Sequence, residues 1–259
     1  MKKFFVMSAA LVALAGCGVK TAPDVIECET VAVADSLELG GSKAVSEVRA
    51  VYPVGQTALA DSVRRWICGQ LGADSAGQTV ADAAGEFVKS TLAEAKSDFE
   101  GFQEEGFALT YGYQVAVDTL FSSPALATYA STFYAYTGGA HGMSRYTPAT
   151  FILADGVRLT WGNTLRPGCE AQMVELIKRG LNDQYFRPNG MSLALGDGLL
   201  VSPDSIGLPS APPFITAKGL QVIYQPYDIA PYAAGMPTCT LPLDSVMPLL
   251  TPAMQSALK

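Results

Sequence analysis

Histidine is almost absent from this chain: its 259 residues contain one, His141. A Ser-His-Asp hydrolase would have to use His141 as its base, and the sequence has no Gly-x-Ser-x-Gly motif to present a serine. Ser144 lies nearby, but a strand neighbour three residues away points to the opposite face of the sheet. We therefore expect no catalytic residues of the triad type.

Metal and cofactor motifs are also missing. Catalytic zinc sites usually use two or three histidines. His141 with Asp118, Asp155 or Asp228 could bind a metal, but the spacing does not require one. Carboxylate pairs of the glycosidase type stay open, because 24 acidic residues always allow some pair at a suitable separation. We expect no metal and no cofactor.

The chain lacks a Walker loop, a Gly-x-Gly-x-x-Gly turn after a strand and a basic stripe, so nucleotide chemistry is not expected. Basic residues are outnumbered by acidic ones, and the net charge is −7. An acidic surface disfavours nucleic acid and anionic lipid as partners. It suits a cationic partner, although an acidic surface that only keeps the protein soluble is the commoner explanation.

None of the five cysteines lies in a Cys-x-x-Cys pair, so the sequence supports neither a zinc knuckle nor a redox motif. One cysteine is assigned to lipid below. The other four allow three disulfide connectivities outside the cytoplasm, or they stay as buried thiols. These four are Cys28, Cys68, Cys169 and Cys239.

Long apolar runs are absent as well, because spanning a bilayer takes about 20 residues. The apolar run at 4–15 is shorter; it follows Lys2-Lys3 and ends in Leu14-Ala15-Gly16-Cys17. This pattern is typical of a bacterial lipoprotein signal. It predicts lipid on Cys17, with an ordinary secretory peptide and a chance cysteine as the alternative.

The predicted signal peptide covers 1–16 and a tether covers 17–24. Cleavage would remove Lys2 and Lys3 and no acidic residue, which leaves 15 basic and 24 acidic residues and a net charge of −9. The mature chain is then expected in the bacterial cell envelope, anchored by lipid on the periplasmic face or the cell surface.

Apolar spacing predicts mixed secondary structure after the tether. Period-two alternation predicts strands, and spacing of three to four predicts helices. The expected strands cover 25–39, 45–54, 109–121, 129–136, 214–216, 220–224 and 238–241, with a hairpin of 150–153 and 157–160 around Asp155-Gly156. The expected helices cover 59–71, 80–102 and 170–185, and a short terminal helix starts from Asp244 as N-cap.

Strands and helices occur in blocks without steady alternation, which predicts an α+β fold with antiparallel sheets covered by helices. We expect two closely packed subdomains, an N-terminal domain over 25–150 and a C-terminal domain over 151–259. The segment between 187 and 213 is rich in Gly, Pro and Ser, and predicts only short turns and a helical or strand fragment.

Two marked segments carry the functional hypotheses. One is the turn Gly138-Gly139-Ala140-His141-Gly142 after Tyr134-Ala135-Tyr136, and the other is 226–235, Pro-Tyr-Asp-Ile-Ala-Pro-Tyr-Ala-Ala-Gly. Glycines permit a sharp turn or a close approach, while prolines fix φ and hold tyrosines. The structural interpretation is that the imidazole bonds the turn's backbone and that the tyrosines pack as lids.

The functional interpretation is a binding surface of tyrosines, which suit recognition of protein or glycan. Its candidate binding residues are Tyr136, Gly139, His141, Tyr227, Asp228 and Tyr232. If the two segments form one site, His141 should lie near Tyr227, Asp228 or Tyr232.

Together these motifs resemble the paired extracellular domains of the lysozyme-sensing anti-sigma factor family, which also precede the catalytic domain of a peptidoglycan deacetylase. The resemblance covers about 25–250 and implies binding of lysozyme or of the cell wall. Met143 stands where asparagine often follows the turn in that family. A sigma-binding segment and the deacetylase's metal-binding domain are not found in this sequence, so neither signalling nor deacetylation is expected.

The sequence thus predicts a lipid-anchored envelope binding protein whose partner is a cell-wall glycan or a cationic wall-attacking protein such as lysozyme. The alternative is an envelope hydrolase that uses His141.

Overall fold

The computed structural model describes residues 26–73, 77–102 and 107–259. The predicted signal peptide, the tether and Cys17 lie outside the described residues. The described residues form two compact units. The second unit consists of 120–129 and 147–259, and the first consists of the other described residues up to 146. We describe each unit by itself. No helix in the described ranges is both long and apolar enough to cross a membrane.

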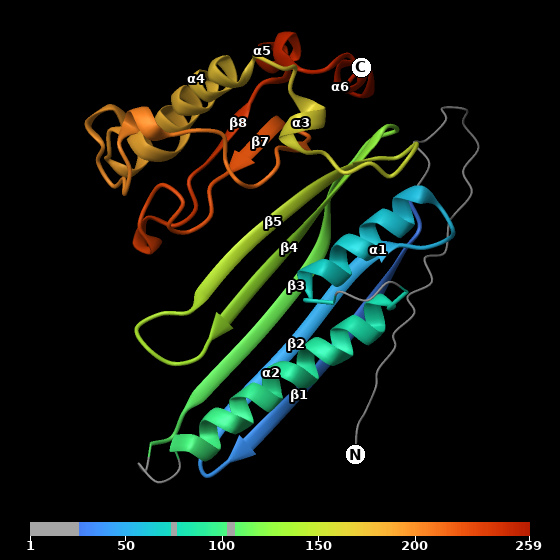
Figure 1. The fold of residues 1–259 in the computed structure, drawn as a ribbon, viewed down its shortest axis with the longest axis vertical. Helices are drawn as coiled ribbons and strands as arrows, with labels where there is room; N and C mark the ends of the chain where they lie inside the picture. The colour runs from blue at the N-terminus through green and yellow to red at the C-terminus, as the bar shows by residue number, and fades with distance from the viewer. Residues whose placement is uncertain (1–25, 74–76, 103–106) are drawn as a thin grey trace, which may run out of the picture. The chain divides into compact units, whose positions relative to one another are not determined.

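A five-stranded sheet in the order β1-β2-β3-β4-β5 runs through the first half of the chain (Figure 1). Each strand has 10 to 13 residues. The strands are β1 (Cys28–Leu39), β2 (Ser42–Pro53), β3 (Thr110–Ser122), β4 (Leu126–Tyr136) and β5 (Met143–Ile152), and the helices between β2 and β3 are α1 (Ala58–Gln70) and α2 (Val80–Phe102).

The α+β class is confirmed, but the expectation of antiparallel pairing throughout is wrong at one place. β1 and β2 form an antiparallel hairpin, whereas β2 and β3 pair in parallel, from Lys43 opposite Thr110 to Ala50 opposite Val117. A parallel pair needs a crossover, and here α1 and α2 supply it. The five-stranded sheet is therefore mixed.

Helices α1 and α2 pack against β1 and β2 on one face of this sheet (Figure 1). Along β2, burial alternates strictly from Ser42 to Ala50, with every second residue exposed. The core between α2 and the sheet contains Phe99 and Tyr111, whose ring centroids are 5.1 Å apart. Burial raises the pKa of the nearby Tyr113 to about 12.

A buried hydroxyl pair also joins α2 to β2. The Thr91 hydroxyl donates to the Phe87 carbonyl oxygen at 2.9 Å. Since that uses its only hydrogen, it must accept from Ser46 Oγ, which lies 2.8 Å away. Both buried hydroxyls are thus satisfied.

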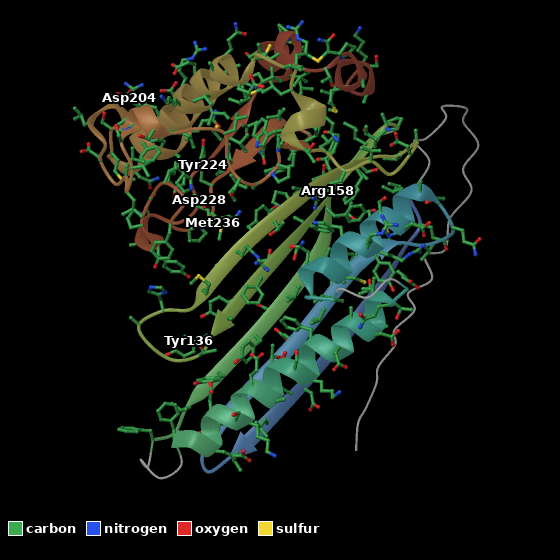
Figure 2. All side chains as sticks on the ribbon, in the orientation of Figure 1. Tyr136, Arg158, Asp204, Tyr224, Asp228 and Met236 are labelled. Atoms are coloured by element: carbon green, nitrogen blue, oxygen red, sulfur yellow. The ribbon has the colours of Figure 1, made fainter. Side chains whose placement is uncertain are left out.

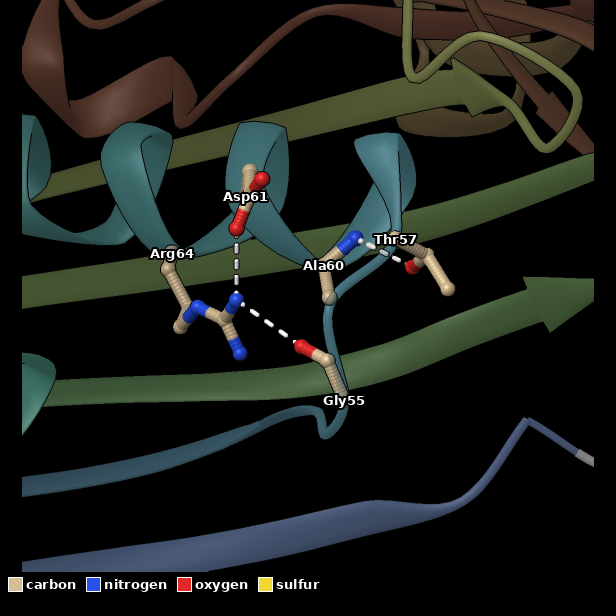
Figure 3. Close-up of polar contacts among 5 residues, drawn as sticks. All are labelled: Gly55, Thr57, Ala60, Asp61 and Arg64. Atoms are coloured by element: carbon tan, nitrogen blue, oxygen red, sulfur yellow. Dashed lines mark hydrogen bonds and ion pairs between the residues drawn. The ribbon is translucent and has the colours of Figure 1, made fainter.

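The start of α1 shows how local chemistry sets a boundary (Figure 3). Thr57 is the N-cap, and its side chain accepts from the Ala60 amide at 3.1 Å. One turn later, Arg64 donates to the Gly55 carbonyl oxygen at 3.0 Å and to the Asp61 carboxylate at 2.6 Å. The loop and the first helical turn are therefore held together by three hydrogen bonds.

The second unit contains a three-stranded antiparallel sheet in the order β6-β7-β8. Helix α4 lies against β8 (Figure 1). The elements are α3 (Trp161–Thr164), α4 (Glu170–Leu181), β6 (Phe214–Thr216), β7 (Gly219–Ile223), β8 (Thr238–Leu241), α5 (Leu243–Val246) and α6 (Pro252–Ala257). A π-helical turn, Asn182–Phe186, extends α4, and short 3-10 turns occupy much of the following segment.

Two details differ from the sequence expectations. Asp244 is not the N-cap of α5, which begins after Pro242 and has no side-chain cap. β5 starts at Met143, well before the expected hairpin strand. Pro148 is tolerated within β5 because this strand is at the edge of the sheet, where a missing N–H need not break a ladder.

The cysteines described by the structure form no disulfide. Cys239 is buried, and its thiol donates to the Ile177 carbonyl oxygen at 3.7 Å. Gly180 allows this approach, since a Cβ at that position would lie 2.9 Å from the Cys239 sulfur. Burial raises the pKa of the Cys239 thiol to about 12. Of the two possibilities left open, buried thiols therefore apply to Cys239 and to the buried Cys68.

A closed ring of hydrogen bonds fixes β6 to the ends of β4 and β5. Thr128 Oγ1 donates to the Ile215 carbonyl oxygen at 2.7 Å, and the Ile215 amide donates to Thr150 Oγ1 at 2.8 Å. The two hydroxyls are 2.8 Å apart. Because the Thr128 hydrogen is already used, Thr150 must donate to Thr128. All three residues are buried.

Replacing Thr128 or Thr150 by valine should lower the free energy of unfolding by about 1–3 kcal/mol, because each change leaves a buried partner unsatisfied. The measurement is urea unfolding followed by circular dichroism. The double variant should cost less than the sum of the two single variants, since the hydroxyls share one ring. Thr132→Val, at an exposed position of β4, is the control. Equal stability of Thr128→Val and this control would contradict the assigned ring.

Candidate functional site

The glycine turn joins β4 to β5 in the first unit. Gly138 and Gly139 have φ values of 90° and 86°, a region that residues with a Cβ rarely occupy. The Tyr136 hydroxyl donates to the Gly139 carbonyl oxygen at 3.1 Å, so the end of β4 closes over the turn. Figure 2 labels Tyr136 at this end of the strand.

His141 takes part in the backbone bonding of this turn. Its Nδ1 lies 2.9 Å from the Gly142 carbonyl oxygen. A carbonyl oxygen can only accept, so Nδ1 carries a proton. The residue is exposed. The geometry therefore places a histidine that bonds its own turn at the surface.

Gly142 permits a close approach between an aromatic ring and the backbone. A Cβ added here would overlap the ring of Tyr134. Tyr134 is 39% exposed, and the adjacent Met143 is 49% exposed. The turn therefore presents a tyrosine, a histidine and a methionine at the surface, and Tyr134 and Met143 were not among the residues predicted to bind.

The tyrosine segment, residues 225–235, follows β7 in the second unit. The Asp228 amide donates to the Gln225 carbonyl oxygen at 3.1 Å, which closes a four-residue turn with Pro226 and Tyr227 in its centre. Tyr227 has a φ of 70°. Proline at the second position excludes the mirror-image turns, so a positive φ at the third defines a type II turn. That third position normally requires glycine or asparagine.

Tyr227 is held in this conformation from both sides. Its amide donates to the Ala230 carbonyl oxygen at 3.1 Å, and the Asp228 carboxylate accepts from the Gln225 amide at 2.9 Å. Ser210 adds a longer hydrogen bond of 3.4 Å to the same carboxylate oxygen. The turn is therefore rigid, and Asp228 is one of the residues that make it so.

The aromatic rings of Tyr227 and Tyr232 form a pair in this segment. Their centroids are 6.1 Å apart and their planes are tilted by 31°. The pair stabilises the folded state by about 0.5–1.5 kcal/mol. The left-handed backbone of Tyr227 costs about 1–2 kcal/mol. These two amounts nearly cancel, so folding stability does not explain why a tyrosine that is 51% exposed occupies this position.

Buried groups anchor the segment to its unit. The Tyr224 hydroxyl donates to the Gly207 carbonyl oxygen at 2.6 Å, and burial raises the pKa of Tyr224. Ile229 and Ala230 are buried, and the Ile229 carbonyl oxygen accepts from the Leu200 amide at 2.9 Å. Tyr185 donates to the Ala234 carbonyl oxygen. Figure 2 labels Tyr224 and Asp228 in this region. Exposed Tyr227 thus projects from a well-anchored support.

The predicted binding residues divide between the two units. Tyr136, Gly139 and His141 lie in the first unit, and Tyr227, Asp228 and Tyr232 lie in the second. A composite site that joins both motifs stays a prediction. Within the described residues, no group of three His, Cys, Asp or Glu side chains could hold a metal ion.

Comparison with known proteins shows that the tyrosine segment lies within a region that matches a protein family. A family described as "Protein of unknown function (DUF3298)" matches residues 211–244. This range begins just before β6, contains the complete tyrosine segment and ends within α5. No curated protein matches the sequence.

The solved structures that resemble most of this chain include two of the DUF3298 family. A member of the DUF3298 family from Bacteroides fragilis NCTC 9343 superposes with a TM-score of 0.76 at 22% identity, covering 89% of this chain and 96% of that one. A DUF3298 family protein from Pseudomonas aeruginosa PAO1 gives 0.63 at 15% identity, covering 90% and 97%. At these identities the likeness establishes the fold alone.

The geometry of the glycine turn predicts that Gly142→Ala displaces the Tyr134 ring, because the new methyl group and the ring would occupy the same space. Because Tyr134 is 39% exposed, its ring can turn toward solvent, so we expect a loss of about 1 kcal/mol of unfolding free energy or less. Gly112→Ala on β3 is the matched control, since a Cβ there meets nothing within 4 Å. Thermal unfolding and the near-ultraviolet circular dichroism of both variants test this. An unchanged tyrosine signal in Gly142→Ala would rule out the close approach.

Proposed function

We propose that this protein is a lipid-anchored binding protein of the bacterial cell envelope, and that residues 225–235 form its binding surface. The observation that carries the proposal is the exposed Tyr227, paired with Tyr232 on a hydrogen-bonded turn where its left-handed backbone gives no net gain in folding stability. Strained backbone of this kind is concentrated at ligand-binding and catalytic sites. The ligand is a cell-wall component or a wall-attacking enzyme such as lysozyme.

The chemistry of this surface favours binding over catalysis. Tyrosine offers a large contact area at a low entropic cost, and a preformed loop lowers the cost further. Support also comes from the resemblance of both motifs to the extracellular domains of the anti-sigma factor family, which implies lysozyme or wall binding. The alternative, an envelope hydrolase, would use His141, which is exposed on the glycine turn.

The envelope location rests on the N-terminal pattern Leu14-Ala15-Gly16-Cys17. The mature net charge of −9 would suit a cationic partner through long-range attraction. Such attraction weakens as salt rises, because the screening length falls to about 8 Å at physiological ionic strength. Salt dependence therefore separates a charged protein partner from a neutral glycan.

If Cys17 is lipidated, the mature protein from native membranes should begin at this residue and carry acyl and thioether-linked lipid. Mass spectrometry of the N-terminal peptide measures this directly. Cys17→Ala should release the protein from the membrane fraction. A mature terminus beginning after Cys17 without modification would exclude the anchor.

The binding proposal is tested with the full-length protein in mild detergent. We expect it to co-sediment with insoluble peptidoglycan or to be captured by immobilised lysozyme, and only the lysozyme interaction should weaken strongly between low and high salt. Binding to neither would refute the proposal. Release of soluble wall fragments that disappears in a folded His141→Ala variant would instead establish the hydrolase.

A further inference from the structure

Tyr227 is the one non-glycine residue in the described ranges that has a positive φ. It stands at the third position of a type II turn, where glycine would be free of strain. Every other positive φ in these ranges belongs to glycine, so the chain elsewhere uses the residue that fits. Tyr227 is therefore an exception to this pattern, and its presence at this position needs an explanation.

Packing inside the protein accounts for only part of the side chain. The Tyr227 ring contacts Tyr232 at a centroid distance of 6.1 Å, yet half of the residue is exposed to solvent. The turn beneath it is closed by the Asp228 carboxylate and by two backbone hydrogen bonds. The backbone that carries the ring is therefore held in place by hydrogen bonds, and Tyr232 packs against one side of the ring.

We propose that Tyr227 directly contacts a sugar ring of the cell-wall glycan, with Tyr232 extending the aromatic surface; this rests on the function proposed above and specifies its ligand class. The flat, apolar face of a pyranose ring complements an exposed tyrosine ring, and its hydroxyl groups remain available for hydrogen bonds.

Asp228 supplies the polar part of the same site. It is exposed, and its Oδ2 accepts from the Gln225 amide. A carboxylate has two oxygens with about four acceptor positions, so it can accept from sugar hydroxyls while it holds the turn. The carboxylate can therefore accept hydrogen bonds from a polyhydroxylated ligand whose apolar face lies against the tyrosine rings.

Substitutions at position 227 separate ligand contact from a structural role. Tyr227→Gly and Tyr227→Asn suit the left-handed backbone, so both should fold with a melting temperature equal to or above that of the wild type. Both should bind peptidoglycan about 10-fold more weakly or worse, as for a central aromatic contact. Tyr227→Phe keeps the ring and should retain most of the binding.

The assay uses full-length protein, insoluble peptidoglycan and, as competitor, a soluble oligomer of N-acetylglucosamine. The competitor should displace the wild type from peptidoglycan. Phe107→Ala removes a residue that is 64% exposed in the first unit, and this control should bind like the wild type. Thermal unfolding of each variant confirms that lost binding is not lost folding.

The remaining outcomes overturn the inference in distinguishable ways. Wild-type binding to peptidoglycan that persists in Tyr227→Gly removes Tyr227 from the site and leaves the proposed function intact. Capture by lysozyme alone, without displacement by the oligosaccharide, assigns the surface to a protein partner. Failure of the wild type to bind either peptidoglycan or lysozyme refutes the proposed function, and the sugar contact with it.

Discussion

The second unit depends on the hydroxyl ring of Thr128, Thr150 and the Ile215 backbone. β6 has three residues, so it brings few ladder hydrogen bonds of its own. The ring satisfies both polar backbone groups of Ile215 by side chains from β4 and β5. A buried backbone group without a hydrogen-bond partner lowers folding stability, and here two threonines supply the partners. The position of β6, and through it of β7 and the tyrosine segment, follows from this arrangement.

Much of the fold could be predicted from the sequence because period-two and helical spacing are strong in this chain. The expected strand 109–121 corresponds to β3, and the expected helix 80–102 corresponds to α2. Periodicity reports which face of a strand is buried, but not which strand lies beside it or in which direction. This is why the parallel pairing of β2 with β3 was missed. β5 was placed too late because Pro148 interrupts its pattern.

The candidate site was also predictable in part, because local residue types indicate where the chain turns. Glycine, proline and tyrosine marked both turns, and glycines at 138 and 139 do adopt the positive φ that such residues allow. The support for Tyr227 was not predictable, because it comes from Asp228, Gln225 and the distant Ser210. A sequence does not reveal that a tyrosine occupies the position of a glycine in a turn. That observation needs the backbone angle.

The terminal place of β1 in the sheet has a consequence for behaviour at high concentration. A strand at the edge of a sheet can pair with a strand of another copy, and β1 has 12 residues with which to do so. Glu29, Asp35 and Glu38 place acidic side chains along it. Two such strands brought together would set like charges against each other. The carboxylates of this strand therefore disfavour edge-to-edge pairing of β1 between copies, independently of how stable the fold is.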